Sequence, residues 1–157
     1  MIQKNKSALM KATDLLSRQD QSEKILRQKL LARKYEESEI DAALDKLKKY
    51  NYLNDEETCA RLFEILYNEE KYSVKQICVK LQQRGYDSNF IESLIPAETY
   101  EHEYNAALKV ATKKFVGKNS TDDLKLKQKI WQHLASKGFS SEIISDVIEE
   151  INSEKQN

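Results

Sequence analysis

The chain has 157 residues, with 26 basic and 26 acidic side chains, 39% hydrophobic residues, three glycines and one proline. Helix formers dominate and no window alternates apolar and polar residues for long, so the composition predicts helix throughout and excludes an extensive sheet. No apolar run approaches the roughly 18 residues of a membrane span, and the modest hydrophobic content predicts small cores in an extended molecule.

Three helices are predicted in the first fifty residues. The first runs from Ala8 to Arg18 with its leucines on one face. Asp20 or Ser22 caps the second helix, and the chain turns around Tyr35. Acidic residues crowd the start of the third helix, where they favour the positive end of the helix dipole.

The next three helices start at residues suited to helix N-termini. Asn54 caps a helix that extends to about Glu70, and Ser73 starts the following one. Gly85 ends that helix, because glycine readily adopts the left-handed helix stop. Asp87 then caps a sixth helix.

The last three helices are predicted with a longer connection. The seventh spans about Glu98 to Phe115, and residues 117–120 form a loop before the eighth, from Thr121 to Ser136. Ser140 caps the ninth helix, and residues 152–157 form a polar tail that we expect to fray.

One pattern recurs in all three groups of helices. Tyr35, Tyr86 and Phe139 each have apolar residues nine and five positions before them and five and nine positions after them. These aromatic residues are 51 and 53 positions apart, a period typical of repeat proteins. The sequence therefore predicts an all-α, elongated and curved array of three tandem three-helix repeats, at residues 1–50, 51–97 and 98–157.

Basic residues also follow the repeat. Arg33, Arg84 and Lys137 stand two positions before the aromatic residue, and Lys29 and Lys80 stand six before it, where the third repeat has a histidine. Residues four apart lie on one helix face, so each repeat places two basic or potentially basic groups on one edge. The third helices are predominantly acidic.

Two interpretations of this basic edge remain open. The cations could pair with the acidic third helix of their own repeat, as solvated contacts worth about 0–1 kcal/mol each. Alternatively, stacked repeats could align them into a ridge for phosphates or an acidic protein surface. Because the net charge is zero, we expect only weak binding to bare DNA at cellular salt and a mixed target of protein and nucleic acid.

Several motifs resemble the RecX family, bacterial regulators of the RecA recombinase. The resemblance covers about residues 8–151 and rests on motif order. The motifs are Ala8-Leu9 with Leu15-Leu16-Ser17-Arg18, Lys29-Leu30-Leu31-Ala32-Arg33-Lys34-Tyr35, Leu53-Asn54-Asp55-Glu56, Leu81-Gln82-Gln83-Arg84-Gly85 and Lys137-Gly138-Phe139-Ser140. The chain departs from the family pattern at Cys59-Ala60, where Phe-Ala is usual, and at Lys34, where glycine is common. It is also less basic than many members.

The resemblance implies a non-enzymatic, cytoplasmic, monomeric regulator in recombination, DNA repair and the SOS response. Family members lie in the helical groove of the RecA filament on single-stranded DNA and restrain its ATPase, strand-exchange and coprotease activities. On this basis the predicted contacts with RecA or DNA are Lys24, Lys29, Arg33, Lys75, Lys80, Arg84, Lys129 and Lys137. Tyr72 could stack on bases, although packing against a neighbouring helix is the commoner use of a tyrosine.

No enzyme motif is present in the sequence. His102 and His133 are isolated, and neither an HExxH motif nor a complete phosphate loop occurs, so we expect no catalytic residues, metal or cofactor. Cys59 and Cys78 are expected to be free buried thiols, with a disulfide or redox switch as the alternative. A repeat module with an unrelated protein partner and a helix-turn-helix regulator of duplex DNA remain alternative functions.

Overall fold

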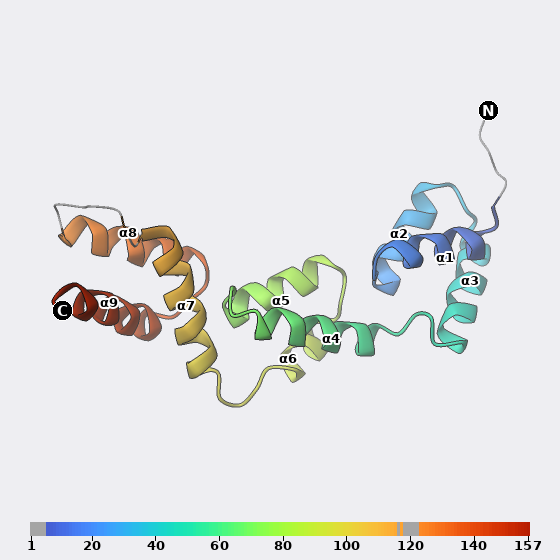
Figure 1. Ribbon diagram of the computed structural model, residues 1–157. Coiled ribbons are helices and arrows are strands. Elements are labelled where there is room, and N and C mark those ends of the chain that lie inside the picture. The colour runs from blue at the N-terminus through green and yellow to red at the C-terminus, as the bar shows by residue number, and fades with distance from the viewer. Residues whose placement is uncertain (1–5, 116, 118–122) are drawn as a thin grey trace.

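The computed structural model describes residues 6–115, 117 and 123–157. Within these residues the chain forms nine α-helices and no strand (Figure 1). Their bounds are α1 Ala8–Arg18, α2 Glu23–Ala32, α3 Glu37–Lys49, α4 Asp55–Asn68, α5 Val74–Gln83, α6 Ser88–Ser93, α7 Tyr100–Phe115, α8 Asp123–Ser136 and α9 Ser141–Lys155. The predicted all-α array of three tandem three-helix repeats is confirmed. We refer to α1–α3, α4–α6 and α7–α9 as the first, second and third units.

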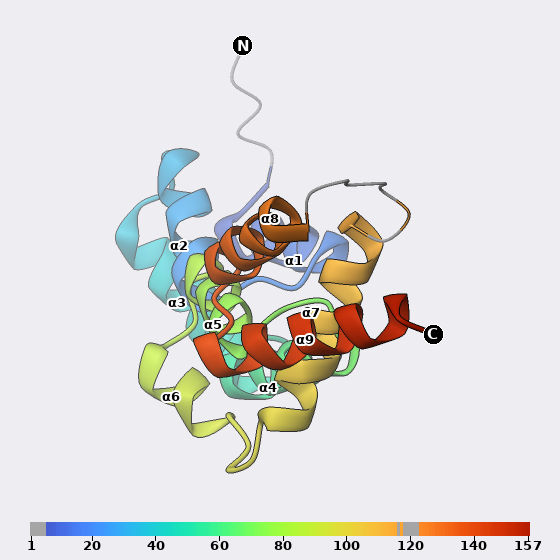
Figure 2. The same ribbon diagram turned by 90° about the vertical axis from the view of Figure 1, so that its left-hand side faces the viewer.

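The three units follow one another along one long axis, so the molecule is elongated (Figure 1). Turned by 90°, the view looks along this axis, and α2, α5 and α8 are projected near one another in the upper and left part of the molecule (Figure 2). The second helix of every unit therefore runs along the same part of the array.

Each unit has its own hydrophobic cluster. The first is built around Leu26, Leu30 and Leu44, and the second around Phe63 and Ile77. The third is built around Ile130, Ile144 and Val147. Leu53 packs with the first cluster, so this core reaches slightly past residue 50. The three clusters are separate, and hydrogen bonds help to join the units.

The repeated aromatic residue marks the same turn after the second helix of each unit. The backbone N–H of Tyr35, Tyr86 and Phe139 donates to the carbonyl of the leucine five residues earlier, at 3.3, 3.2 and 3.2 Å. The residue before the aromatic has a positive φ in all three turns. This is the Schellman arrangement, which brings the aromatic residue against an apolar residue of the last helical turn and explains the five-residue spacing in the sequence.

The predicted helix caps are confirmed at Asn54, Ser73, Asp87 and Ser140, each of which accepts a backbone N–H of its own helix. For α2, where two residues were possible, Ser22 is the cap, and its Oγ accepts the Ile25 N–H at 3.2 Å.

Two helix boundaries differ from the sequence prediction. α7 begins at Tyr100 rather than Glu98. α9 continues to Lys155, although fraying was predicted from residue 152, because Ile151 is buried in the third cluster and fixes the last turns. Residues 118–120 of the predicted loop and Thr121 lie outside the described residues.

Both cysteines are free, as predicted. Cys59 is fully buried, and burial raises the pKa of its thiol to about 11, whereas Cys78 is only partly buried. The Cys59 thiolate is therefore scarce at neutral pH, which makes this residue inert. Over the described part of the chain, no helix is long and apolar enough to cross a membrane.

Candidate nucleic-acid interface

The first and second units meet where the N-terminus of α2 sits on the C-terminal turn of α5. The buried Ser22 Oγ donates to the Arg84 carbonyl at 2.6 Å while it also caps α2. A Cβ added to Gly85 would lie 2.5 Å from this oxygen. Glycine is therefore required here for the close approach of the two helices as well as for its φ of +87°.

The second and third units meet through the same arrangement. Ser73 is also fully buried, and its Oγ donates to the Lys137 carbonyl at 2.6 Å and accepts the Gln76 N–H at 3.1 Å. A Cβ on Gly138 would lie 3.0 Å from the Ser73 Oγ. At both junctions the positive N-terminus of one second helix meets the carbonyl end of the next, an alignment that the helix dipoles favour.

A carboxylate from the following unit completes each junction. Asp55 accepts the Glu23 N–H at 3.0 Å, and Glu103 accepts the Val74 N–H at 2.9 Å. Burial raises the pKa of both carboxyl groups. The helix N-terminus partly offsets this burial, because its dipole favours the charged form.

These junctions bring predicted contact residues of different units together. The added Cβ on Gly85 would lie 3.3 Å from the Lys24 Cβ, and that on Gly138 would lie 3.2 Å from the Lys75 Cβ. Lys24 is thus beside the turn that carries Arg84, and Lys75 is beside the turn that carries Lys137.

A groove of about 370 Å³ opens at the second junction, and Lys75, Lys80 and Lys137 all line it. The Lys80 ammonium group lies 4.5 Å from the centre of the Tyr72 ring, a cation–π contact. Tyr72 also packs against the second hydrophobic cluster. Tyr72 is therefore engaged in packing, which leaves less of its ring available to stack on a nucleotide base.

The remaining predicted residues lie toward the two ends of this line. Arg33 donates to the Lys29 carbonyl at 2.8 Å, so these two residues share the last turn of α2, beyond the first junction. Lys129 lies on α8, on the face that also carries His133, about two helical turns before Lys137, which follows the end of this helix. We name the eight residues the cationic ridge: Lys24, Lys29, Arg33, Lys75, Lys80, Arg84, Lys129 and Lys137.

The interpretation that these cations pair with the third helix of their own unit is wrong. None of the eight forms an ion pair with a carboxylate of the described residues. The pairs that join second and third helices use other residues, Arg27 with Asp41 at 2.7 Å and Lys48 with Glu23 at 3.1 Å. The ridge is therefore free to meet an external anion.

Sequence reasoning missed a second group of cations beside the ridge. Lys109, Lys113 and Lys114 of α7 line a cavity of about 700 Å³ together with His133 and Lys137. The adjacent pair Lys113-Lys114 was the available signal, but these residues belong to a first helix and fall outside the repeat register.

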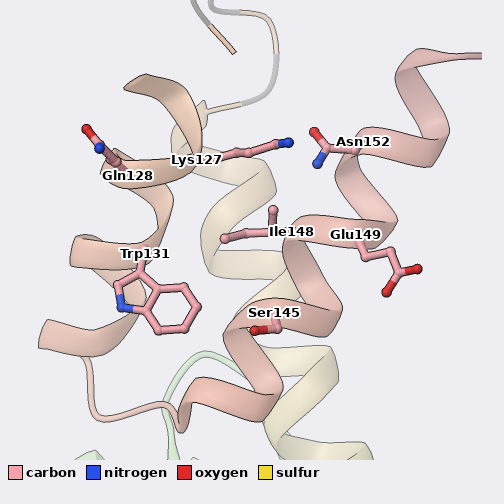
Figure 3. Close-up of a pocket in the computed structure, with 7 residues that line it drawn as sticks. All are labelled: Lys127, Gln128, Trp131, Ser145, Ile148, Glu149 and Asn152. Carbon is pink, nitrogen blue, oxygen red and sulfur yellow. The ribbon is translucent and has the colours of Figure 1, made fainter. Parts of the chain in front are cut away.

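A third hollow, between α8 and α9, has a different character (Figure 3). Trp131 and Ile148 line it, and Trp131 is 40% exposed although its neighbours Ile130 and Leu134 are buried. Among the residues that the structure covers, no group of His, Cys, Asp or Glu side chains could hold a metal ion.

The fold and the ridge define a class of protein: an all-α tandem array of three-helix units with a cationic edge along its second helices. Two family models match, the first three-helix domain of RecX at residues 8–47 and the third at residues 101–148. The regulatory protein RecX of Haemophilus influenzae (strain PittEE) is 34% identical over 145 residues, which cover 90% of this chain and 92% of that protein. The chain belongs to the RecX family.

Other relatives agree with this assignment, and solved structures share the fold. The regulatory protein RecX of Clostridioides difficile is 32% identical over 141 residues, and the match covers 90% of this chain and 66% of that protein. The chain thus spans about two thirds of the length of this relative. The crystal structure of RecX from Lactobacillus salivarius has a TM-score of 0.73 at 24% identity and covers 92% of this chain and 94% of its own. A second crystal structure, of a regulatory protein RecX, has a TM-score of 0.78 at 25% identity and covers 90% of this chain and 71% of its own.

Proposed function

We propose that this protein is a non-enzymatic, monomeric regulator that lies in the helical groove of the RecA filament on single-stranded DNA, in the cytoplasm, and inhibits RecA ATPase, strand-exchange and coprotease activity. Its relatives bear the name regulatory protein RecX, which points to RecA. The observation that carries the proposal is the cationic ridge, which has no carboxylate partner among the described residues and continues across both junctions between units.

The dimensions of the ridge suit a long groove. α2, α5 and α8 have 10, 10 and 14 residues. At a rise of 1.5 Å per residue they extend about 50 Å in total, longer than a small domain is wide. A rod of this length can contact neighbouring filament subunits together with the strand they hold. The zero net charge of the chain makes single-stranded DNA alone a weak ligand.

The alternative function, a helix-turn-helix regulator of duplex DNA, fits the same architecture less well. Such a protein inserts a recognition helix into the major groove, between two rows of phosphates. α3 exposes Glu37, Glu39 and Asp41, and α9 exposes Glu142 and Glu149. These carboxylates would repel the phosphates, so the third helices are unsuited to that role.

The test is inhibition of ATP hydrolysis by RecA on single-stranded DNA. The wild-type protein should lower the hydrolysis rate, and the triple variant Arg33→Glu, Arg84→Glu and Lys137→Glu should inhibit much more weakly with unchanged helicity. A matched control, Lys46→Glu, Lys49→Glu and Lys155→Glu, gives the same change in net charge on third helices and should inhibit like wild type.

The salt dependence separates direct phosphate contacts from general attraction. Losing three phosphate contacts should reduce the slope of log affinity against log salt by about 2, since each contact to a single strand contributes about 0.7. Equal inhibition by all three proteins would remove the ridge from the proposal. No inhibition by wild type, with capture of another protein, would favour a repeat module with a different partner.

A further inference from the structure

The cavity beside the ridge joins the second and third units. Its walls come from the link between α4 and α5, with Glu69, Glu70 and Lys71, and from α7 and α8. We name it the lysine pocket and define it by Lys109, Lys113, Lys114, His133 and Lys137 on the side of the third unit.

Both carboxylates that line the pocket already have polar partners within the protein. Glu70 accepts from Lys109 at 2.5 Å and from Asn105 at 3.2 Å. Glu69 lies 3.9 Å from Lys71. Lys113, Lys114 and Lys137 have no carboxylate partner among the described residues, so three positive charges border the cavity without compensation.

The pKa of His133 responds to the positive charges that surround it. The Lys114 Nζ donates to the His133 Nδ1 at 3.2 Å, which fixes the ring proton on Nε2 in the neutral form. Burial lowers the pKa of His133, and the charges of Lys114 and Lys137 lower it further. Phe115 packs edge-on against the ring. An anion in the pocket would oppose this effect, because it favours the imidazolium form.

We propose that the lysine pocket binds backbone phosphates of a single strand of nucleic acid, which passes into it from the groove of Lys75 and Lys80. Lys137 lines both hollows, so the two sites adjoin at this residue. The strand then turns from the second helices toward α7 and bridges two units. This inference rests on the proposed function and extends it by assigning the path of the strand.

The chemistry of the pocket favours phosphate over an acidic peptide. Its cations are all lysines, which bind phosphate as point charges, and it has no arginine fork for bidentate pairing with carboxylates. Val110 is its one aliphatic lining residue, so the pocket offers no cluster of aliphatic side chains to anchor those of a peptide.

NMR titration of the two histidines of the chain tests the assignment. An oligothymidylate at low salt should raise the pKa of His133, whereas the resonances of His102, which is stacked on Tyr67 outside the pocket, should not change. Thymine and phosphodiester groups do not titrate in this range. The variant Lys113→Gln with Lys114→Gln should abolish this response and weaken oligonucleotide binding roughly tenfold, with a loss of about 1.4 in salt slope. The control Lys46→Gln with Lys49→Gln should bind and respond like wild type.

Competing ligands and the RecA assay complete the test. Inorganic pyrophosphate that raises the pKa of His133 and is not displaced by the oligonucleotide would identify a free phosphate site and overturn the strand assignment. A polyglutamate peptide that acts as well as the oligonucleotide would overturn it in favour of an acidic protein segment. Oligonucleotide binding with no change at His133 would exclude the pocket while the ridge and the RecA proposal stand. A His133 response in a protein that does not inhibit RecA would support the pocket and contradict the RecA proposal.

Discussion

The same turn follows the second helix of each unit, at a junction in two of them and at a free end in the other. Gly85 and Gly138 have φ values of +87° and +88° and lie against the serine cap of the preceding unit. Lys34 has a φ of +66° in the equivalent turn, and it is exposed. A side chain is therefore compatible with the turn itself. The close approach of a neighbouring helix is what requires glycine at the other two positions.

The two junctions also differ from each other. The first is the tighter at its glycine, with a Cβ at Gly85 only 2.5 Å from the Ser22 Oγ. Both have further side-chain contacts: Arg61 pairs with Asp20 at 2.7 Å at the first junction. At the second, His102 stacks on Tyr67 at 3.8 Å between ring centres and reaches the Tyr72 carbonyl at 2.9 Å. The first junction should thus be the more sensitive to a single methyl group.

The largest expected effect is that of Gly85→Ala. The left-handed backbone costs an alanine about 1–2 kcal/mol, and the methyl group displaces the Ser22 Oγ from both of its hydrogen bonds. We expect a loss of about 3 kcal/mol in the free energy of unfolding. Denaturant unfolding followed by circular dichroism measures it, and a separate early transition would show that the first unit uncouples from the rest.

Gly117→Ala is the control for this variant. Gly117 has the same φ of +87°, but an added Cβ has no atom within 4 Å. Only the backbone cost of about 1–2 kcal/mol should remain. Equal losses for Gly85→Ala and Gly117→Ala would mean that the junction contact contributes nothing beyond the turn.

Gly138→Ala should fall between these two variants, at a loss of about 2 kcal/mol. Its nearest neighbours are the Ser73 Oγ at 3.0 Å and the Lys75 side chain at 3.2 and 3.3 Å. The lysine can move aside, and the serine needs to shift by only a few tenths of an ångström. The same unfolding experiment applies, and a loss greater than that of Gly85→Ala would contradict the difference between the junctions.

The sequence predicted the helices well because their signals are local. Periodic apolar residues, caps such as Asn54 and Ser73, and the glycine stop at Gly85 each act within a few residues of one another. The extension of α9 past residue 152 was not predicted, because the burial of Ile151 depends on tertiary packing, which the polar composition of the tail does not reveal.

The site was only partly predictable for a related reason. The repeat register identified the cations of the second helices, but the junction contacts join residues 62 and 64 positions apart, Ser22 with Arg84 and Ser73 with Lys137. No sequence window contains both partners. The lysine pocket was missed because its residues come from α7, α8 and a link of the preceding unit, and its shape exists only in the assembled array.

A smaller effect on stability, which depends on pH, is expected from Glu103, the carboxylate of the second junction. One Glu103 oxygen accepts the Val74 N–H, and the other is buried without a partner. Burial raises the pKa of Glu103 in the folded state, so the folded protein holds this proton more tightly than the unfolded chain. The resulting stabilisation is complete below the unfolded value of about 4.5 and is lost as pH rises through the folded pKa.

Glu103→Gln should keep the hydrogen bond to the α5 N-terminus and remove this dependence. The stability of the variant relative to wild type should therefore increase from pH 4 to pH 7, as measured by urea unfolding at several pH values. Glu101→Gln, an exposed neighbour on α7, is the matched control and should follow wild type. A difference that stays constant with pH would show that Glu103 does not titrate differently on folding.

The smallest expected effect is that of Lys34→Gly, the reciprocal of the glycine substitutions. Removing the side chain relieves about 1 kcal/mol of left-handed strain, but glycine gains a similar amount of freedom in the unfolded chain. The net change should stay within about 0.5 kcal/mol, since no neighbouring unit contacts this turn. A change well above 1 kcal/mol in the same unfolding experiment would make the turn itself the source of the glycine requirement. If Lys34→Gly leaves the stability nearly unchanged while Gly85→Ala lowers it strongly, the junction is the source of the glycine requirement.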